Sequence, residues 1–133
     1  MRKLMIGLAV FSLVLGMASS VMAETKMYEF IFEYEGMYKY SDVTSKADGE
    51  TNYYVRQTFS GRPTGEDPRT RYYSYYNNAR VSKTLNLSCD DLERHFEAYT
   101  IASPQTGTGY QLYGQNVTGL GSTHFHIVGK WTP

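Results

Sequence analysis

Three histidines are the residues whose type and spacing could bind a metal ion. His124 and His126 stand one residue apart in a segment of alternating polarity, so a strand would place both imidazoles on one face, about 6–7 Å apart. That spacing can hold zinc or copper, and His95 on a neighbouring strand would supply a third ligand. A polar strand face in water is the more common arrangement, because Phe125 and Ile127 occupy the opposite face. We therefore expect no metal or other cofactor.

Glu29, Glu33 and Glu35 are the carboxylates whose spacing could serve acid–base chemistry on glycosides, since a strand places all three on one face. Such a mechanism needs one carboxyl group protonated while its partner is ionised, so their surroundings must differ. Nothing in the neighbouring sequence separates the environments of these residues. A solvated strand face explains the pattern better, and the chain is predicted not to be an enzyme.

Cys89 is the only cysteine, so the chain has no internal disulfide. Three interpretations of its thiol are open. It is a small buried hydrophobic side chain, or it forms a disulfide between two copies and so makes a dimer, or it is a catalytic thiol partnered by a histidine. The first is the ordinary state of a free cysteine in a folded domain.

Tyrosine is the most unusual component, with 13 residues in the chain. Many stand in adjacent pairs, and neighbouring side chains of a strand point to opposite faces, so one of each pair should lie outside the core. Exposed tyrosines suit the binding of sugars or proteins, because each offers a rigid ring and a hydroxyl. The competing explanation is that tyrosine simply favours strands. The candidate binding residues are Tyr54, Tyr72, Tyr73, Tyr75, Tyr76 and Arg71. Other arginines that would make this surface basic as well as aromatic are Arg56, Arg62, Arg69 and Arg80.

Alternation with period two predicts the elements that position these side chains. Over 27–35 the even positions are aromatic and most odd positions are glutamate, which indicates a strand with one buried face. The residues expected on that face are Tyr28, Phe30, Phe32 and Tyr34. A second strand over 53–59 should bury Tyr53, Val55 and Phe59.

Turn signals divide the rest of the chain into further strands. Asn77 and Asn78 can adopt positive φ and close a hairpin between strands over 71–76 and 80–87. More strands are expected over 95–102, 110–115 and 124–131, and the inward residues of these later segments include Val81, Leu85, Leu87, Phe125, Ile127 and Trp131.

The stretch 90–94 reads differently, because Ser88 and Asp91 resemble a helix-capping pair and predict one helical turn. About seven short strands, with turn signals between them, predict an all-β fold. The expected architecture is an antiparallel β-sandwich or a small barrel.

The first 23 residues have the layout of a secretory signal peptide. Arg2 and Lys3 precede an apolar run over 4–14, and Val21 and Ala23 fit the small-residue positions of a cleavage site. The run is too short to span a bilayer, so no stable membrane insertion is expected after cleavage. Residues 24–133 should form a single β-rich domain that is secreted. This domain holds 11 basic and 13 acidic side chains, a net charge of −2 that gives no reason to expect a nucleic acid as partner.

The order of several segments resembles a known group of proteins. The segments are Phe30-Ile31-Phe32, Val81 to Leu87, Glu97-Ala98-Tyr99 and Val128-Gly129-Lys130-Trp131. Together with the leader they are similar to small secreted proteins of Gram-positive bacteria whose function is uncharacterised, and which are related in genomic context to the lactococcin 972-like bacteriocins. The resemblance implies a secreted all-β domain with a role in antagonism or at the cell envelope, and it transfers no site residues.

These observations lead to one main expectation and two alternatives. The chain is predicted to be a secreted, non-enzymatic binding protein with a bacteriocin-like or cell-envelope role, and its partner to be a protein or glycan at a cell surface. The first alternative is a carbohydrate- or cell-wall-binding module that uses exposed tyrosines. The second is a small hydrolase or metalloenzyme.

Overall fold

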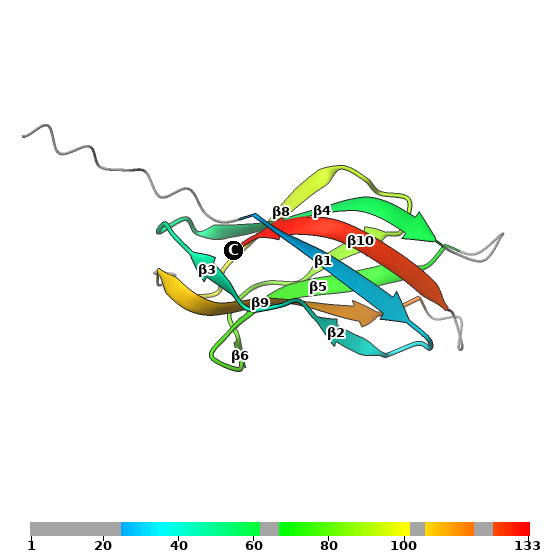
Figure 1. Cartoon of the computed structure of the whole chain (residues 1–133), viewed down its shortest axis with the longest axis horizontal. Coiled ribbons are helices and arrows are strands. Elements are labelled where there is room, and N and C mark those ends of the chain that lie inside the picture. Colours follow the sequence, from blue (N-terminus) through cyan, green and yellow to red (C-terminus); the bar gives the residue numbers. More distant parts are fainter. Residues whose placement is uncertain (1–24, 62–66, 102–105, 119–123) are drawn as a thin grey trace, which may run out of the picture.

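Two antiparallel sheets build the fold of the computed structural model, which describes residues 25–61, 67–101, 106–118 and 124–133. Ten strands and no helix occur within these ranges. The four-stranded sheet has the order β1 (Lys26–Phe32), β10 (Phe125–Thr132), β4 (Asn52–Gly61) and β8 (Arg94–Ala98) (Figure 1). The last strand of the chain therefore lies between the first and the fourth.

The six-stranded sheet forms the second layer. Its main path runs β2 (Tyr38–Tyr40), β9 (Gly107–Asn116), β5 (Arg69–Tyr76) and β6 (Ala79–Arg80). Beside this path β3 (Thr44–Lys46) pairs with β9, and β7 (Leu85–Ser88) pairs with β5. The all-β sandwich is confirmed, and the barrel alternative is wrong, because the two sheets do not join into one closed sheet.

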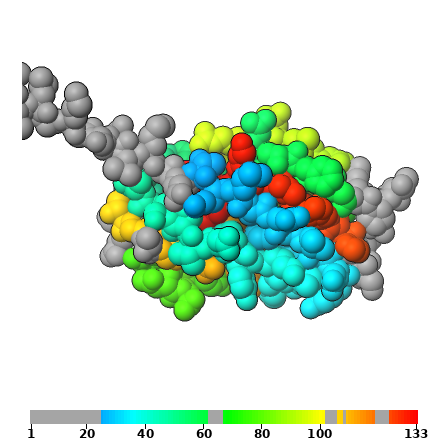
Figure 2. Space-filling view, in the orientation of Figure 1, coloured from blue at the N-terminus to red at the C-terminus, as the bar shows by residue number. Residues whose placement is uncertain are grey.

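The edges β1 and β2 lie next to each other in space. Figure 2 shows the blue residues of β1 beside the cyan residues that follow it in the chain, on one face of the molecule.

The expected count of about seven strands was too low, because β2 and β3 have three residues each and show no readable alternation. The expected strand over 80–87 is also divided, into β6 and β7.

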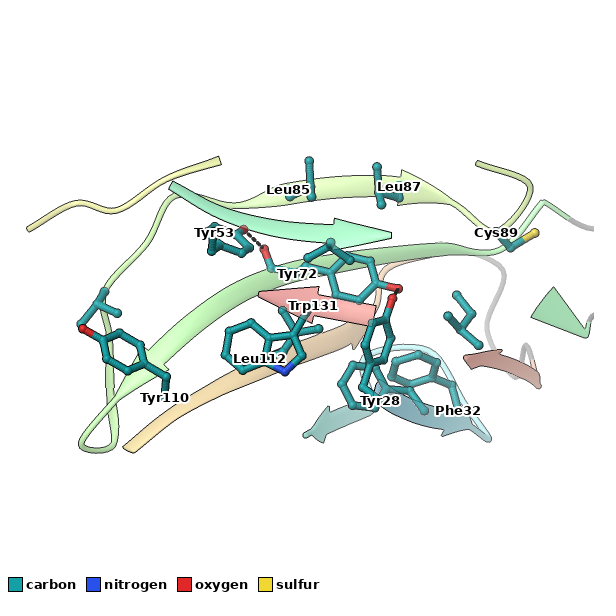
Figure 3. Packing of buried hydrophobic residues seen from close by; sticks show 14 of the residues in the cluster. Tyr28, Phe32, Tyr53, Tyr72, Leu85, Leu87, Cys89, Tyr110, Leu112 and Trp131 are labelled. Carbon is teal, nitrogen blue, oxygen red and sulfur yellow. Dashed lines mark hydrogen bonds between the residues drawn. The ribbon is translucent and has the colours of Figure 1, made fainter. Parts of the chain in front are cut away.

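Aromatic rings from both sheets fill the space between the layers (Figure 3). Phe30 illustrates the packing: its ring centroid lies 4.8 Å from that of Tyr28 and 6.4 Å from that of Tyr72 in the other sheet. The predicted inward residues of the later strands are confirmed as buried, among them Val81, Leu85, Leu87, Phe125, Ile127 and Trp131.

A chain of hydrogen bonds crosses this core. The hydroxyl of Tyr28 donates to the hydroxyl of Tyr72 at 3.2 Å, and Tyr72 donates to Oε1 of Gln57 at 2.8 Å. The amide nitrogen of Gln57 in turn donates to the carbonyls of Ser88 and Asp91, at 2.8 and 2.7 Å. The polar groups of these three side chains are thereby satisfied, which burial in an apolar core requires.

The helical turn expected over 90–94 is wrong. Asp91 N donates to the carbonyl of Ser88 at 3.1 Å, and the carboxylate of Asp91 accepts a bond from Glu93 N. Gln57 occupies the carbonyls of Ser88 and Asp91 that a helix would use for its own bonds. The segment is consequently a turn that leads into β8.

Two predicted buried residues lie outside the core. β1 ends at Phe32, and Gly36 turns the chain with a φ of 80°, so Tyr34 is exposed. In β4, Gln57 pairs with Gly129 and Phe59 pairs with Val128, so Thr58 is an extra residue that forms a β-bulge. The alternation that buries Tyr53 and Val55 continues to Gln57, and the bulge reverses it after that residue, so Phe59 is exposed. Tyr28, Phe30, Phe32, Tyr53 and Val55 are buried as predicted.

The hairpin at Asn77 and Asn78 is confirmed, with φ values of 48° and 62°.

At the edge of the six-stranded sheet that β3 forms, the Lys46 side chain is buried and its ammonium donates to Pro133 O at 3.0 Å. The C-terminal end of the chain accordingly lies near β3 (Figure 1).

Candidate functional site

Five tyrosines gather on the outer surface of the six-stranded sheet, and we call this group the tyrosine face: Tyr38, Tyr40, Tyr73, Tyr75 and Tyr113. Strand register explains their meeting. Tyr113 of β9 is directly opposite Tyr40 of β2 on one side and Tyr73 of β5 on the other. Opposed residues of neighbouring strands project to the same side of a sheet, so three strands each contribute a ring to one row.

The rings stack on one another around Tyr113. Its centroid lies 4.9 Å from that of Tyr73, 5.0 Å from that of Tyr75 and 5.5 Å from that of Tyr40, with interplanar angles of 24° to 26°. The guanidinium of Arg80 covers the far end of the stack, 4.9 Å from the Tyr73 centroid. Most ring faces are therefore covered within the stack, while Tyr40 at the sheet edge is 64% exposed.

A pocket of about 280 Å³ opens on the tyrosine face. Its walls are the rings of Tyr40, Tyr75 and Tyr113 and the amides of Asn78 and Gln111. Gln111 donates to Ser41 O at 3.1 Å, which fixes its amide and leaves its side-chain oxygen able to accept a bond. The volume is near the lower limit of the roughly 300–1,000 Å³ typical of small-molecule sites, which suits one ring-sized group.

Two phenols of the stack, those of Tyr73 and Tyr113, have a raised pKa. Burial raises the pKa of Tyr73, and the neighbouring Tyr113 and Tyr75 raise this pKa further. Burial is also the main cause of the raised pKa of Tyr113. At neutral pH these hydroxyls are donors as well as acceptors, so the face can exchange hydrogen bonds with a ligand rich in hydroxyl groups.

The structure divides the candidate binding residues predicted from the sequence among three places. Tyr73, Tyr75 and Arg71 lie on the outer surface of β5, as a binding site requires. Tyr72 is fully buried in the core, and the partly buried Tyr76 stacks on Tyr110 at 4.5 Å, so neither belongs to the tyrosine face.

Tyr54 belongs to the other sheet. It pairs there with Phe96, and the guanidinium of Arg94 lies 4.0 Å from its ring. This smaller group is exposed, and its tyrosine hydroxyl is engaged by Glu50.

Three members of the tyrosine face were missed as candidates: Tyr38, Tyr40 and Tyr113. The predicted candidates are mostly adjacent tyrosines, although adjacent residues of a strand point to opposite faces of the sheet. A spacing of two would have been the better signal, because Tyr38 with Tyr40 and Tyr73 with Tyr75 each share one face.

The histidines are separated by the fold. His126 lies on the outer surface of the four-stranded sheet and its Nε2 is 2.8 Å from Glu29. His95 is opposite the inward-facing Val55, and its Nε2 is 2.8 Å from Asp91. Within the described ranges, neither ring is hydrogen-bonded to a hydroxyl or a thiol, and no group of three possible metal ligands includes a histidine. His95 thus lies on the opposite face from His126, and cannot complete the predicted metal site with His124 and His126.

The thiol of Cys89 is fully buried, as its first interpretation expects. Its Sγ lies 3.8 Å from Asp90 Oδ1, and together with Asp67 these residues bring three possible metal ligands within 4.8 Å of one another. Asp67 already accepts a hydrogen bond from Ser88, so contacts within the turn account for the arrangement. A dimer through Cys89 remains a prediction, and it would require this turn to open.

A second groove, of about 360 Å³, lies where the edges of the two sheets meet. Tyr40 lines it on one side, and Met27 and Glu29 line it on the other. Tyr40 also lines the pocket on the tyrosine face, so the two hollows share this residue.

Comparison of the chain with protein-family profiles, with curated proteins and with solved structures finds no match. None of the described segments forms a helix that is long and apolar enough to cross a membrane.

Proposed function

We propose that this chain is an exported, non-enzymatic binding protein that recognises carbohydrate through the tyrosine face. The observation that carries the proposal is the pocket walled by Tyr40, Tyr75 and Tyr113 and edged by the amides of Asn78 and Gln111. Sugars combine apolar C–H faces with a rim of hydroxyls. Aromatic rings suit the former, and amides and phenols suit the latter.

The tyrosine face is also arranged to bind without reorganisation. Each ring of the stack is held by its neighbours, so little side-chain entropy is lost when a ligand arrives. The stack stands on three paired strands rather than on a loop, which keeps the pocket walls in place.

The setting of this activity comes from the leader over 1–23 and from the resemblance to secreted bacterial proteins. An exported protein meets the glycans of a cell surface, so recognition of envelope carbohydrate is the role we propose. A bacteriocin-like effect on another cell would follow from the same binding step, and no reaction catalysed by this chain is needed for it.

Isothermal titration calorimetry of the purified chain with soluble oligosaccharides tests the proposal. Binding should be lost, or weakened at least about tenfold, in Tyr40→Ala, because this exposed ring forms a wall of the pocket. The matched control is Phe96→Ala, since Phe96 is 61% exposed on the other sheet and Tyr40 is 64% exposed. The proposal fails if no oligosaccharide binds, or if Phe96→Ala weakens binding as much as Tyr40→Ala.

A further inference from the structure

We propose that the carbohydrate held by the tyrosine face carries anionic groups, such as carboxylate or sulfate, and that Arg71 pairs with them. This inference rests on the proposed function and adds a ligand class to it. It is carried by the distribution of charge over the two sheets and by the position of one guanidinium.

The six strands of the sheet that bears the tyrosine face contain no aspartate and no glutamate. Their charged residues are all basic: Lys39, Lys46, Arg69, Arg71 and Arg80. Of these residues, Arg69, Arg71 and Arg80 lie on the outer surface with Tyr73 and Tyr75, whereas Lys46 is buried and pairs with Asp48, and Lys39 lies opposite the inward-facing Gly114. The strands of the four-stranded sheet carry both signs, since Glu29 and Glu97 occur there with the basic residues Lys26, Arg56, Arg94 and Lys130. The strands of the six-stranded sheet therefore place only positive charge on the outer surface that bears the tyrosine face, which favours an anionic ligand there.

Arg71 is the member of this set that is placed to meet a ligand. It is exposed on β5, two residues from Tyr73, and its partners across the strands are the uncharged Gln115 and Asn86. In the part of the chain that the structure describes, no carboxylate forms an ion pair with it.

Arg80 is different, because its guanidinium is already engaged. It donates to Ser82 O at 2.9 Å and to the Thr84 hydroxyl at 2.6 Å while it covers Tyr73. Its role is to hold the stack, whereas the five donors of Arg71 can form a bidentate pair with a carboxylate or sulfate.

The spacing along β5 fits a short oligosaccharide. Tyr75 lines the pocket, and Arg71 lies four residues away on the same side of the strand, a distance of roughly 13 Å. One sugar ring can therefore occupy the pocket while the acidic group of a following unit reaches the guanidinium. Gln115, opposite Arg71, supplies an amide beside this second position.

Nucleic acid is the other common ligand of a basic, aromatic surface, and the stack argues against it. Base recognition by aromatic side chains uses open ring faces. Here Tyr113 is stacked against Tyr73 and Tyr75 within about 5 Å, and Arg80 covers the outer side of Tyr73. The most exposed ring, Tyr40, lies beside the amides of Asn78 and Gln111, which suits a single sugar ring, whereas a nucleic-acid strand needs a row of open rings for successive bases.

The test measures affinity for three oligosaccharides of equal length: a neutral oligoglucose, an oligogalacturonate with carboxylates, and a sulfated glycosaminoglycan fragment. We expect the chain to bind at least one acidic probe at least about tenfold more tightly than the neutral probe, with a preference that weakens as salt rises. Carboxylate and sulfate are distinguished by which acidic probe is preferred. Arg71→Gln should remove the preference and leave binding of the neutral probe unchanged. Arg94→Gln is the matched control, because Arg94 covers Tyr54 on the other sheet and should have no effect.

The outcomes separate the two proposals. Equal affinity for neutral and acidic probes would overturn the anionic assignment and leave carbohydrate binding intact. A preference for acidic probes that survives Arg71→Gln would overturn the role of Arg71. If a single-stranded oligonucleotide binds as tightly as the best sugar and depends on Arg71, the carbohydrate class is wrong. Binding of no sugar at all would refute the proposed function itself.

Discussion

Gly114→Ala should destabilise the fold, although it adds only one methyl group. Gly114 lies in β9 between Tyr113 and Gln115, and its Cα faces the core beneath the tyrosine face. A Cβ at this position would lie 2.6 Å from Cε2 and 2.7 Å from Cδ2 of Phe30. Carbon atoms pack best at about 3.5–4.0 Å, so the ring of Phe30 would have to move by about 1 Å.

The surroundings of Phe30 make that movement costly. Its ring is held between Tyr28, 4.8 Å away between centroids, Phe32 at 6.0 Å and Tyr72 at 6.4 Å. Overpacking of this kind costs about 1–3 kcal/mol. A domain of this size has roughly 5–15 kcal/mol in total, and its Tm falls by about 4–8 °C for each kcal/mol lost.

Urea denaturation followed by circular dichroism measures the change in the free energy of unfolding. Gly49→Ala is the control, because nothing lies within 4 Å of the added Cβ there, and it should be neutral or slightly stabilising. Phe30→Leu shortens the side chain that the new methyl group meets. The double variant Gly114→Ala, Phe30→Leu should therefore lose less stability than the sum of the single variants. If Gly114→Ala is as stable as Gly49→Ala, the close packing of Phe30 in β1 against the backbone of β9 is wrong.

Three further predictions concern the core, the buried phenols and the leader. Phe32→Ala should cost about 3–5 kcal/mol, because Phe32 is fully buried, while Glu33→Ala on the exposed neighbour should change stability by less than about 0.5 kcal/mol; equal losses in thermal denaturation would refute the strand register. Burial raises the pKa of Tyr28, Tyr53 and Tyr72 in the folded chain, whereas unfolded tyrosines ionise near pH 10. Their contribution to stability is therefore fully present below about pH 10 and is lost as the pH rises further, by up to about 1.4 kcal/mol per pH unit for each tyrosine; a free energy of unfolding that stays constant between about pH 9 and pH 11 would contradict this. Mass spectrometry of the culture medium should find a chain that begins at Glu24. A full-length species retained in the membrane would contradict the predicted cleavage of a signal peptide over 1–23.

The strands and most of the core could be predicted from local patterns. The aromatic alternation of β1 follows from period two, and the hairpin after β5 follows from two asparagines that adopt positive φ. Both signals lie within a few residues of the structure that they specify. The sandwich follows from the number and spacing of such segments.

The bulge in β4 and the candidate site could not be predicted in this way. Nothing around Thr58 marks it as the extra residue, because the bulge is defined by pairing with β10 about 70 positions later. The tyrosine face likewise exists only because β9 lies between β2 and β5, which brings Tyr113 between Tyr40 and Tyr73. Strand order of this kind is a property of the whole chain and is absent from any short window.

The position of β10 inside the four-stranded sheet also constrains how the chain acquires its structure. Among the residues that the structure describes, β1 has no neighbour in that sheet except β10, and β4 is linked to β1 only through the same strand. A growing chain can pair β4 with β8, but it cannot add β1 to this layer before 125–132 is available, since Phe32 finds its partner Phe125 only then. Pairings so distant in sequence make folding late and slow. The four-stranded sheet is therefore completed only when the last strand of the chain is free.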